Sequence, residues 1–315
     1  MVAIVKKVFI DGGAGTTGLR IVQRLSERKD LELIRLPEEL RKDENARKEA
    51  LNRADVAFLC LPDDAAREAA SWVENETTTV IDTSTAHRTA EGWTYGFPEI
   101  GGLREKIRHA RRIANPGCHA SGFIALIAPL AERGLIDPAE KLTCFSLTGY
   151  SGGGKKMIAQ YETEGRDGLL DAPRLYGLGQ THKHLPEMKK ICGLDAEPVF
   201  CPIVAPYYAG MEVVVPLHAG QIRGGKAAAE ACYRAYYQNG LVCYDAGDED
   251  GFLSAGVLAG RDDMTVTVCG SAERLTLVAR FDNLGKGASG AAIQNMNLRL
   301  GFDETAGLNC KGETE

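Results

Sequence analysis

The nine cysteines of the sequence include no C-x-x-C pair, and their spacing is scattered. Zinc sites and disulfide frameworks are usually recognised by regular cysteine spacing, so the sequence indicates neither. An odd number of cysteines without a pattern is typical of a reducing compartment, and we therefore expect a cytoplasmic protein.

Long apolar runs and runs of one charge are also missing. No stretch approaches the roughly 20 apolar residues that span a membrane. Residues 1–10 are interpreted as a strand followed at once by glycines, rather than as a signal peptide. Lys and Arg number 37 against 43 Asp and Glu, and no basic cluster is long enough to follow a nucleic-acid backbone. We expect neither a membrane nor a nucleic acid as a partner.

No internal repeat, low-complexity segment or Pro/Ser-rich linker divides the 315 residues, although this length is typical of two domains. The first third instead alternates regularly between short apolar runs and helical patterns. This alternation predicts a parallel sheet with helices on its faces. The predicted strands are 5–11, 31–36, 56–61 and 78–83, and the predicted helices are 16–29, 44–54 and 63–75.

The middle of the chain has longer connections between its strand-like segments, which predicts an α+β domain with a mixed or antiparallel sheet. The domain boundary is expected near Pro116–Gly117. The predicted strands are 142–149, 197–204, 211–218, 265–270 and 274–281. The predicted helices are 118–134 and 225–240, with a further helix in the tail at 285–302.

A glycine-rich loop lies between the first strand and the first helix. Gly13-x-Gly15-x-x-Gly18 supplies a tight turn, a close approach to a pyrophosphate and helix–strand packing. Thr16 and Thr17 add hydroxyl donors at the helix N-terminus, which favours anions. The loop therefore predicts dinucleotide binding, and the alternative is an ordinary glycine turn.

The end of the second strand bears on which dinucleotide is bound. An Arg there accommodates the extra phosphate of NADP, whereas an acidic residue is typical of NAD proteins. Arg35 therefore favours NADP, although Glu38 and Glu39 lie just beyond it; the alternative is a solvated cation at a strand end. Ser84, after the fourth strand, is a further candidate for cofactor binding.

The stretch GYSGGGKK at 149–156 nearly matches a phosphate-binding P-loop. Lys156 stands where that motif needs Ser or Thr to hold magnesium, so a nucleotide triphosphatase is not indicated. The amides and cation at Ser151, Gly152 and Lys155 still suit an anionic group such as a phosphate. The alternative is a flexible surface turn.

Cys118, in the stretch NPGCHASG, directly follows a Pro-Gly pair and begins a predicted helix. A thiol at a helix N-terminus has a lowered pKa, because the helix dipole favours the thiolate. A lone cysteine is more often a core residue. Beside a nicotinamide cofactor, however, a thiolate is suited to form a thioester or thiohemiacetal with a carbonyl carbon during hydride transfer.

A proton donor and acceptor is expected in the stretch GLGQTHKHLPEM. If this segment is extended, His182 and His184 share a face and can both border the thiol. The alternatives are a surface pair or a metal pair, but no third ligand at recognisable spacing is present, so we expect no metal. His119 adjoins Cys118 and is expected to point elsewhere on a helix. No neighbouring motif indicates a functional role for the remaining histidines, which are His87, His109 and His218.

Five motifs occur in order along the chain: GGAGTTG, NPGC, GYSGGGK, HKHLPE and DNLGKGASGAAIQNMN. Together they resemble the N-acetyl-gamma-glutamyl-phosphate reductase family, and the length is similar to the shorter of its two subtypes. The resemblance spans nearly the whole chain. Lys183 stands where the family more usually has Arg, which puts any role of that residue in doubt.

This resemblance implies an α/β Rossmann-type NADP-binding domain, formed by residues 1–117 and 286–315. It also implies an α+β domain, residues 118–285, of the aspartate-semialdehyde and glyceraldehyde-3-phosphate dehydrogenase type. The implied reaction, in arginine biosynthesis, is NADPH-dependent reduction of N-acetyl-L-glutamyl 5-phosphate to the 5-semialdehyde, with phosphate release, through a thioester on Cys118. We interpret His184 as the acid/base group and His182 as the group that orients the acyl group or helps to hold the oxyanion. Family members commonly form dimers or tetramers, so a homo-oligomer is expected.

Asn283 and Gly287 match the region of the family's nicotinamide-side contacts. Cations available for the substrate phosphate are Arg111, Arg112, Lys155 and Arg166. Two related enzymes stay open as alternatives: aspartate-semialdehyde dehydrogenase, which ordinarily lacks the paired histidines, and a carrier-linked lysine-pathway reductase. A non-catalytic NADP sensor with a structural Cys118 is the alternative from another class.

Overall fold

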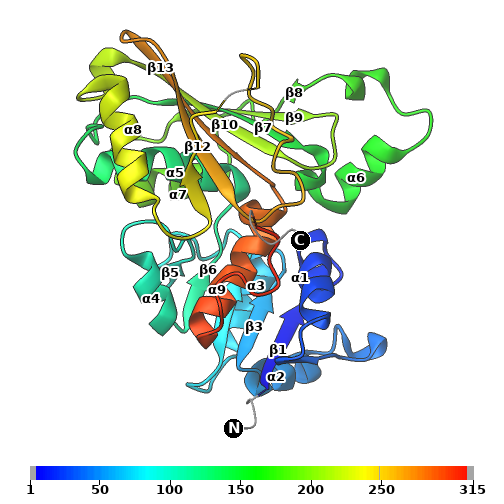
Figure 1. Cartoon of the computed structure of the whole chain (residues 1–315). Helices are drawn as coiled ribbons and strands as arrows, with labels where there is room; N and C mark the ends of the chain where they lie inside the picture. Colours follow the sequence, from blue (N-terminus) through cyan, green and yellow to red (C-terminus); the bar gives the residue numbers. More distant parts are fainter. Residues whose placement is uncertain (1–4, 248, 311–315) are drawn as a thin grey trace. The chain divides into compact units, whose positions relative to one another are not determined.

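The computed structural model describes residues 5–247 and 249–310. Within them the chain forms two compact units, which are described here one at a time (Figure 1). Unit 1 comprises residues up to 98, 103–116 and 288–308, and unit 2 comprises 99–102, 117–287 and 309 onward.

Unit 1 contains a six-stranded sheet in the order β2-β1-β3-β4-β6-β5, in which every paired strand is parallel. This confirms the predicted Rossmann-type α/β architecture. Its strands are β1 (Lys6–Asp11), β2 (Leu31–Ile34), β3 (Val56–Leu59), β4 (Thr79–Asp82), β5 (Thr94–Tyr95) and β6 (Arg112–Ala114). Its α-helices are α1 (Thr16–Ser26), α2 (Glu44–Arg53), α3 (Asp63–Ser71), α4 (Leu103–His109) and α9 (Gly290–Leu300), and a short 3₁₀ turn, η1, spans Glu38–Leu40.

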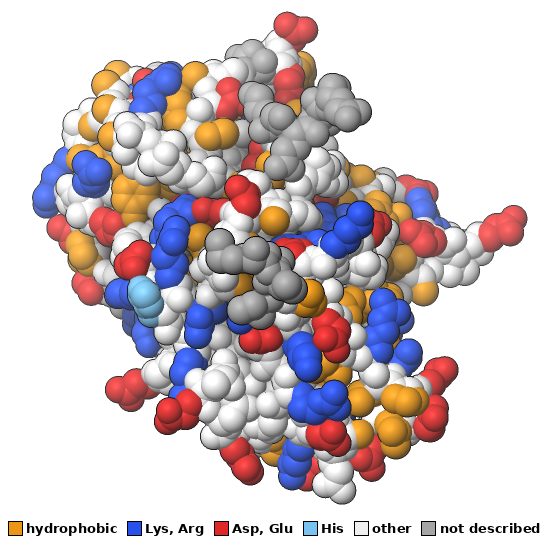
Figure 2. Space-filling model, turned by 60° about the horizontal axis from the view of Figure 1, so that its bottom comes forward, with side chains coloured by type: hydrophobic (Ala, Val, Ile, Leu, Met, Phe, Trp, Pro, Cys, Tyr) orange, Lys and Arg blue, Asp and Glu red, His pale blue; other side chains and the backbone are white. Residues whose placement is uncertain are grey.

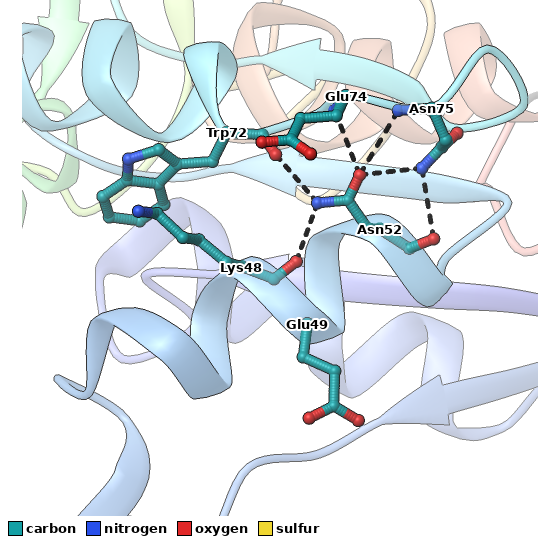
Figure 3. Close-up of a pocket in the computed structure, with 6 residues that line it drawn as sticks. All are labelled: Lys48, Glu49, Asn52, Trp72, Glu74 and Asn75. Carbon is teal, nitrogen blue, oxygen red and sulfur yellow. Dashed lines mark hydrogen bonds between the residues drawn. The ribbon is translucent and has the colours of Figure 1, made fainter.

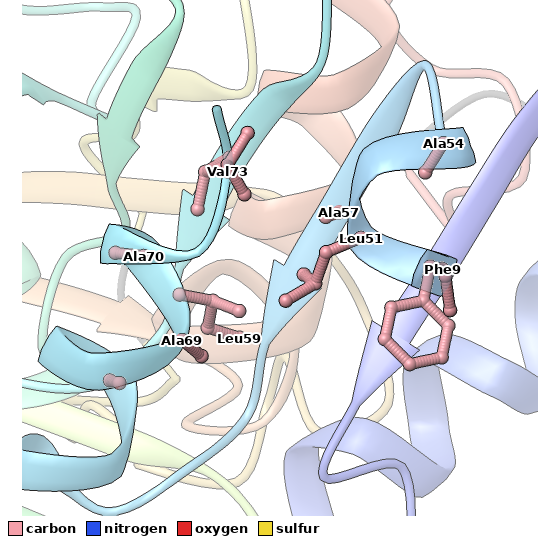
Figure 4. Close-up of a cluster of buried hydrophobic side chains, with 11 residues drawn as sticks. Phe9, Leu51, Ala54, Ala57, Leu59, Ala69, Ala70 and Val73 are labelled. Carbon is pink, nitrogen blue, oxygen red and sulfur yellow. The ribbon is translucent and has the colours of Figure 1, made fainter. Parts of the chain in front are cut away.

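The core of unit 1 lies along β3, whose four residues are all buried. Leu59 of β3 and Leu51 of α2 belong to one buried cluster, together with Val73 after α3 (Figure 4). The buried residues of α3 are alanines, and Ala69 is one of them. A side chain this small lets the helix backbone lie close to the sheet and cover one of its faces. Strands that are covered on both faces are apolar along their whole length, as the short apolar runs predict.

Unit 2 contains a seven-stranded mixed sheet in the order β11-β12-β13-β10-β7-β9-β8, which confirms the predicted α+β type. Its strands are β7 (Thr143–Gly149), β8 (Arg174–Leu175), β9 (Val199–Ala205), β10 (Met211–His218), β11 (Val242–Tyr244), β12 (Met264–Gly270) and β13 (Arg274–Phe281). Its α-helices are α5 (Cys118–Glu132), α6 (Gly154–Glu162), α7 (Leu185–Cys192) and α8 (Gly225–Tyr236). A π-helical segment, η5 (Gly285–Ser289), begins in unit 2 and ends in unit 1, since the division between the units falls after Gly287. Helix α5 packs against β10 and β13, and α7 packs against α5.

The units divide near the predicted domain boundaries, with differences that specific contacts explain. Residues 99–102, Gly117, residues 286–287 and residues from 309 onward belong to unit 2. Glu99 and Lys286 form a fully buried ion pair, with Nζ 2.8 Å from Oε2. Asn309 donates its backbone N–H to Asp262 Oδ2 over 2.8 Å. Such long-range pairs join residues far apart in the sequence, so neither composition nor local motifs indicate them.

Helices α6 and α7 are not among the predicted helices. Helix α6 begins at Gly154, where φ is +72°, and α7 carries Pro186 in its first turn. Glycine and proline usually signal turns, so both starts resemble loops in the sequence. The predicted extended segment around the histidine pair is wrong, because His184 has φ −88° and ψ −12° and forms the N-cap of α7.

The described surface carries both signs of charge. On the face drawn in Figure 2, Lys and Arg side chains are interspersed with Asp and Glu side chains. Within residues 5–247 and 249–310, no helix is long and apolar enough to cross a bilayer.

Candidate active site

The turn between β1 and α1 is built on glycines that leave no room for a side chain. At Gly12, φ is +79° and a Cβ would lie 2.3 Å from the carbonyl oxygen of Cys60. At Gly18, a Cβ would lie 2.7 Å from the Gly12 oxygen. At Gly15, the nearest atom would be 3.6 Å away, so this backbone is open to an approaching group. Packing therefore requires glycine at Gly12 and Gly18, whereas a Cβ at Gly13, predicted as the first of the three, would meet only ordinary contacts at 3.4 Å or more.

Helix α1 begins directly after this turn without a side-chain cap. Gly15 is its N-cap, and the first-turn residues include Thr16 and Thr17. The first N–H groups of a helix have no acceptor within the helix, and they carry the positive end of its dipole. An open glycine backbone leading into an uncapped helix fits the pyrophosphate of a dinucleotide.

Two further predicted cofactor residues lie just beyond the carboxyl ends of two strands of this sheet, β2 and β4. Arg35 directly follows β2 and is exposed. Ser84 is buried after β4, where its hydroxyl donates to Asp82 Oδ2 over 2.7 Å and accepts from the backbone N–H of Ala86. The Ser84 hydroxyl is thus engaged in its own turn. His87, which has no evident partner in the sequence, places Nδ1 2.6 Å from the same Asp82 carboxylate.

In unit 2, helix α5 begins at Cys118, the residue at which the sequence predicts it to begin. Gly117 is the N-cap, with extended backbone and no side-chain cap, so the half-buried thiol lies at the positive end of the helix dipole. Glu187 of α7 accepts the Gly117 N–H over 3.2 Å through a buried carboxylate, which holds the start of α7 beside the start of α5. Gly287 also approaches the thiol, because a Cβ at that position would lie 3.0 Å from Cys118 Cβ.

Other cysteines lack such surroundings. Burial raises the pKa of the Cys60 thiol to about 12 and also raises the pKa of Cys144 and Cys192. A buried thiol remains protonated at neutral pH because the thiolate loses its hydration. Cys144 and Cys192 are core residues, and Cys60 is partly buried.

Three histidine rings gather in unit 2. The ring centroids of His182 and His184 are 4.7 Å apart, and His119 lies 5.6 Å from the first and 5.5 Å from the second. His119 was expected to point elsewhere; this is wrong, because it lies in contact with the pair. No local pattern signals this contact, since the rings come from α5 and from the chain that leads into α7.

The histidine pair is fixed by local backbone geometry. The backbone N–H of His184 donates to His182 Nδ1 over 3.2 Å. His182 is half-buried and His184 is buried. An Nδ1 that accepts a hydrogen bond leaves the neutral His182 ring with its proton on Nε2, so His182 is held as a donor at Nε2.

The glycine-rich stretch after β7 is structured. Residues Tyr150–Gly153 form a 3₁₀ turn that leads into α6. Ser151 is buried and its hydroxyl accepts from Asn283 Nδ2 over 3.0 Å, while Asn283 Oδ1 accepts the Gly210 N–H. Gly152 lies beside them, with a hypothetical Cβ 3.5 Å from Asn283 Nδ2. The structure thus brings together Ser151, Gly152 and Asn283. The first two were predicted to bind a phosphate group, whereas Asn283 was predicted to contact the cofactor.

The predicted cations are in different situations. Lys155 is exposed in the first turn of α6. Arg166 pairs with Asp171 over 2.5 Å. Arg111 precedes β6 and donates to the Asn75 carbonyl at the amino edge of the parallel sheet, and Arg112 begins that strand. Ligands of such sheets bind at the opposite, carboxyl edge, so we do not retain Arg111 as a phosphate contact.

A surface hollow of about 580 Å³ lies at the same amino edge of unit 1 (Figure 3). Asn52 donates to the carbonyls of Lys48 and Trp72 and accepts from Asn75 Nδ2. The hollow is lined by residues of α2 and of the chain that follows α3. It therefore lies away from the carboxyl ends of the strands, where ligands of such sheets bind. Among the described residues, no group of three or more His, Cys, Asp or Glu side chains is arranged to hold a metal.

Comparisons with known proteins agree with these two units. Residues 7–110 match a family model described as semialdehyde dehydrogenase, NAD binding domain. Residues 118–283 match a model described as semialdehyde dehydrogenase, dimerisation domain. The first model bears out a nicotinamide-cofactor domain in the first third of the chain.

Named relatives resemble the chain over nearly its whole length. N-acetyl-gamma-glutamyl-phosphate reductase 2 of a Nostoc species is 43% identical, over 96% of this chain and 99% of the relative. The reductase of Brucella ovis is 45% identical, over 94% and 99%.

Solved structures share the fold. Aspartate semialdehyde dehydrogenase II of Vibrio cholerae has a TM-score of 0.70 at 17% identity, covering 94% of this chain and 98% of that one. The aspartate semialdehyde dehydrogenase of Candida albicans, solved with NADP, has a TM-score of 0.66 at 18% identity, covering 93% and 98%. At these identities the likeness shows the fold alone. The identity to the named reductases and the two matching domain models show that the chain belongs to the N-acetyl-gamma-glutamyl-phosphate reductase family of the semialdehyde dehydrogenases.

Proposed function

We propose that the protein catalyses the NADPH-dependent reduction of N-acetyl-L-glutamyl 5-phosphate to N-acetyl-L-glutamate 5-semialdehyde, with release of phosphate. The observation that carries this proposal is the half-buried Cys118 at the uncapped start of α5, in a unit that also gathers three histidine rings. The named relatives, at 43% and 45% identity, supply the substrate class.

Unit 1 holds the cofactor in this proposal. The turn at Gly12, Gly15 and Gly18 and the amides that open α1 bind the pyrophosphate. Arg35, directly after β2, is our candidate for the 2′-phosphate. When bound, the reduced nicotinamide supplies the hydride that converts the enzyme thioester to a thiohemiacetal.

Cys118 performs the covalent steps. Its thiolate, favoured by the helix N-terminus, attacks the acyl carbon, and the carbon–oxygen bond to phosphate breaks to leave a thioester. The amides of Cys118 and His119 at the helix start hold the oxyanion. His184 supplies the proton as the thiohemiacetal collapses to aldehyde and thiol, and His182 orients the acyl group from Nε2.

Lys155 is our candidate for the leaving phosphate. It is exposed at the start of α6, in the same glycine-rich stretch as Ser151 and Gly152, whereas Arg166 is already paired with Asp171. An ammonium on a flexible stem serves as a point charge for phosphate.

The reverse reaction tests the function. We expect the protein to reduce NADP with N-acetylglutamate 5-semialdehyde and phosphate at a kcat/KM far above that with aspartate semialdehyde. A preference for aspartate semialdehyde would assign the chain to the related dehydrogenase. Stoichiometric NADP binding with no turnover of either aldehyde would assign it to a sensor.

Cofactor choice is tested at Arg35. Changing Arg35 to Asp is expected to weaken NADPH strongly and NADH little, because the new carboxylate repels the 2′-phosphate. The measurement is the Kd of each cofactor by fluorescence titration, with Arg41→Asp, in the same connection after β2, as the matched control. An equal loss of affinity for NADPH and NADH would show that another cation distinguishes the two cofactors.

We also propose a homo-oligomer assembled through unit 2. On the face of its sheet away from α5, an apolar row crosses three strands: Phe145, Leu147, Val199, Ile203 and Val214. Phe145 is 40% and Val199 55% exposed. The matching model is described as a dimerisation domain. A second copy that covered this row would bury apolar surface.

Replacing Phe145 with Lys is expected to dissociate the oligomer, because a charge would be buried in the contact. Light scattering gives the mass, and Val5→Lys, an exposed apolar position in unit 1, is the control. An unchanged oligomer mass for Phe145→Lys would exclude this face. We also propose a cytoplasmic location, because an odd number of cysteines with scattered spacing is typical of a reducing compartment.

A further inference from the structure

His119 is held between two hydroxyl groups. It is the second residue of α5 and is buried, with its Nδ1 2.7 Å from Ser146 Oγ of β7. Its Nε2 lies 2.6 Å from the hydroxyl of Tyr176, which follows β8. Both ring nitrogens are therefore engaged, and the imidazole has a single orientation.

The surroundings of His119 disfavour a positive charge. The rings of His182, His184 and Phe200 pack against it, with centroids 5.3–5.6 Å away. Burial, and then the charge of His182, lower the pKa of His119 to about 3. The titratable groups that contact it are Tyr176 after β8 and the two histidines before α7, His182 and His184. Cys118 precedes it on α5, and Glu187 accepts a hydrogen bond from Gly117 at the start of that helix.

A neutral imidazole satisfies both contacts. It donates from one nitrogen and accepts at the other, and a hydroxyl can take either role. The phenol of Tyr176 also stays protonated, because burial and then the negative charge of Cys118 raise the pKa of Tyr176. The three hydrogen-bonded side chains of Ser146, His119 and Tyr176 can thus all remain uncharged near neutral pH.

We infer that His119 is a positioning residue: an uncharged bridge that fixes Tyr176 and the two neighbouring imidazoles, and that leaves the single proton of the three-histidine cluster to His182 or His184. This inference rests on the proposed function for its catalytic consequence. Its structural content, a histidine that does not titrate at neutral pH, is independent of the substrate.

Two replacements of His119 separate bridging from proton transfer. Gln has one donor and one acceptor at its amide and cannot be protonated, so His119→Gln is expected to keep kcat within about tenfold and to preserve the histidine limb of the pH profile. Phe fills the ring space without hydrogen bonds, so His119→Phe is expected to lower kcat by roughly 10²-fold through misplaced neighbours. Ser146→Ala, which removes one hydroxyl, is expected to fall between them.

Two results of these kinetic measurements would overturn the inference. Loss of the histidine limb in His119→Gln would make His119 a proton carrier. A profile and kcat for His119→Phe equal to the unmodified protein would remove any positioning role.

A second measurement does not depend on activity or on the folding of the Phe variant. In the whole protein labelled with ¹⁵N-histidine, the signals lost in His119→Gln identify His119. We expect these signals to remain those of a neutral ring from pH 8 to pH 5. Titration of His119 within this range overturns the inference even if the proposed function holds. An inactive protein with a neutral His119 would instead overturn the proposed function alone.

Discussion

Cys118→Ser is expected to lower kcat by about 10⁴-fold or more while NADPH binding is retained. A hydroxyl at the start of α5 stays neutral, because the helix dipole is far too weak to ionise it, and a neutral hydroxyl is a poor nucleophile toward an acyl carbon. The measurement pairs steady-state turnover with a cofactor titration. Cofactor binding is expected to persist because the glycine turn is contained in unit 1.

Cys201→Ser is the matched control, since Cys201 is a partly buried thiol on β9 of the same unit. It is expected to retain turnover. Iodoacetamide at neutral pH is expected to modify Cys118 first, because burial raises the pKa of the Cys60, Cys192 and Cys232 thiols. A Cys118→Ser protein that keeps a large share of its turnover would contradict the assignment of the nucleophile.

Replacing His184 with Asn is expected to lower kcat by about 10²–10⁴-fold, the usual contribution of a general acid/base group. The structure supplies a reason to prefer His184 over His182. Protonating His182 at Nδ1 would destroy the hydrogen bond that this atom accepts from the His184 backbone. His182 is therefore the less suitable proton carrier in this proposal, and we assign the proton transfer to His184.

The pH dependence of kcat separates the two histidines. His184→Asn is expected to remove the limb near the unperturbed histidine pKa of about 6.5, whereas His182→Asn is expected to act mainly on KM. The reverse pattern would exchange the roles. Two variants that both keep the limb would show that the proton comes from water or another group.

The sequence by itself predicted the elements whose signals are local. Short apolar runs alternating with helical patterns predicted the parallel sheet of unit 1, because strands buried on both faces must be apolar along their whole length. The Pro-Gly pair before Cys118 predicted where α5 begins, since proline and glycine end the preceding strand. The glycine-rich turn was recognised from the same kind of signal, although one residue away from the glycine that the packing requires.

The tertiary structure decided whatever depends on contacts between distant residues. Gly12 must be glycine because the backbone at Cys60, on the neighbouring strand, leaves no space for a Cβ. His119 lies in the histidine cluster because hydrogen bonds hold its ring between two hydroxyl groups. One belongs to Ser146 of β7 and the other to Tyr176, directly after β8. The start of α7 is helical despite Pro186, since proline is tolerated in a first helical turn. Local sequence determines which element forms, but which side chains meet is set by the packing of one element against another.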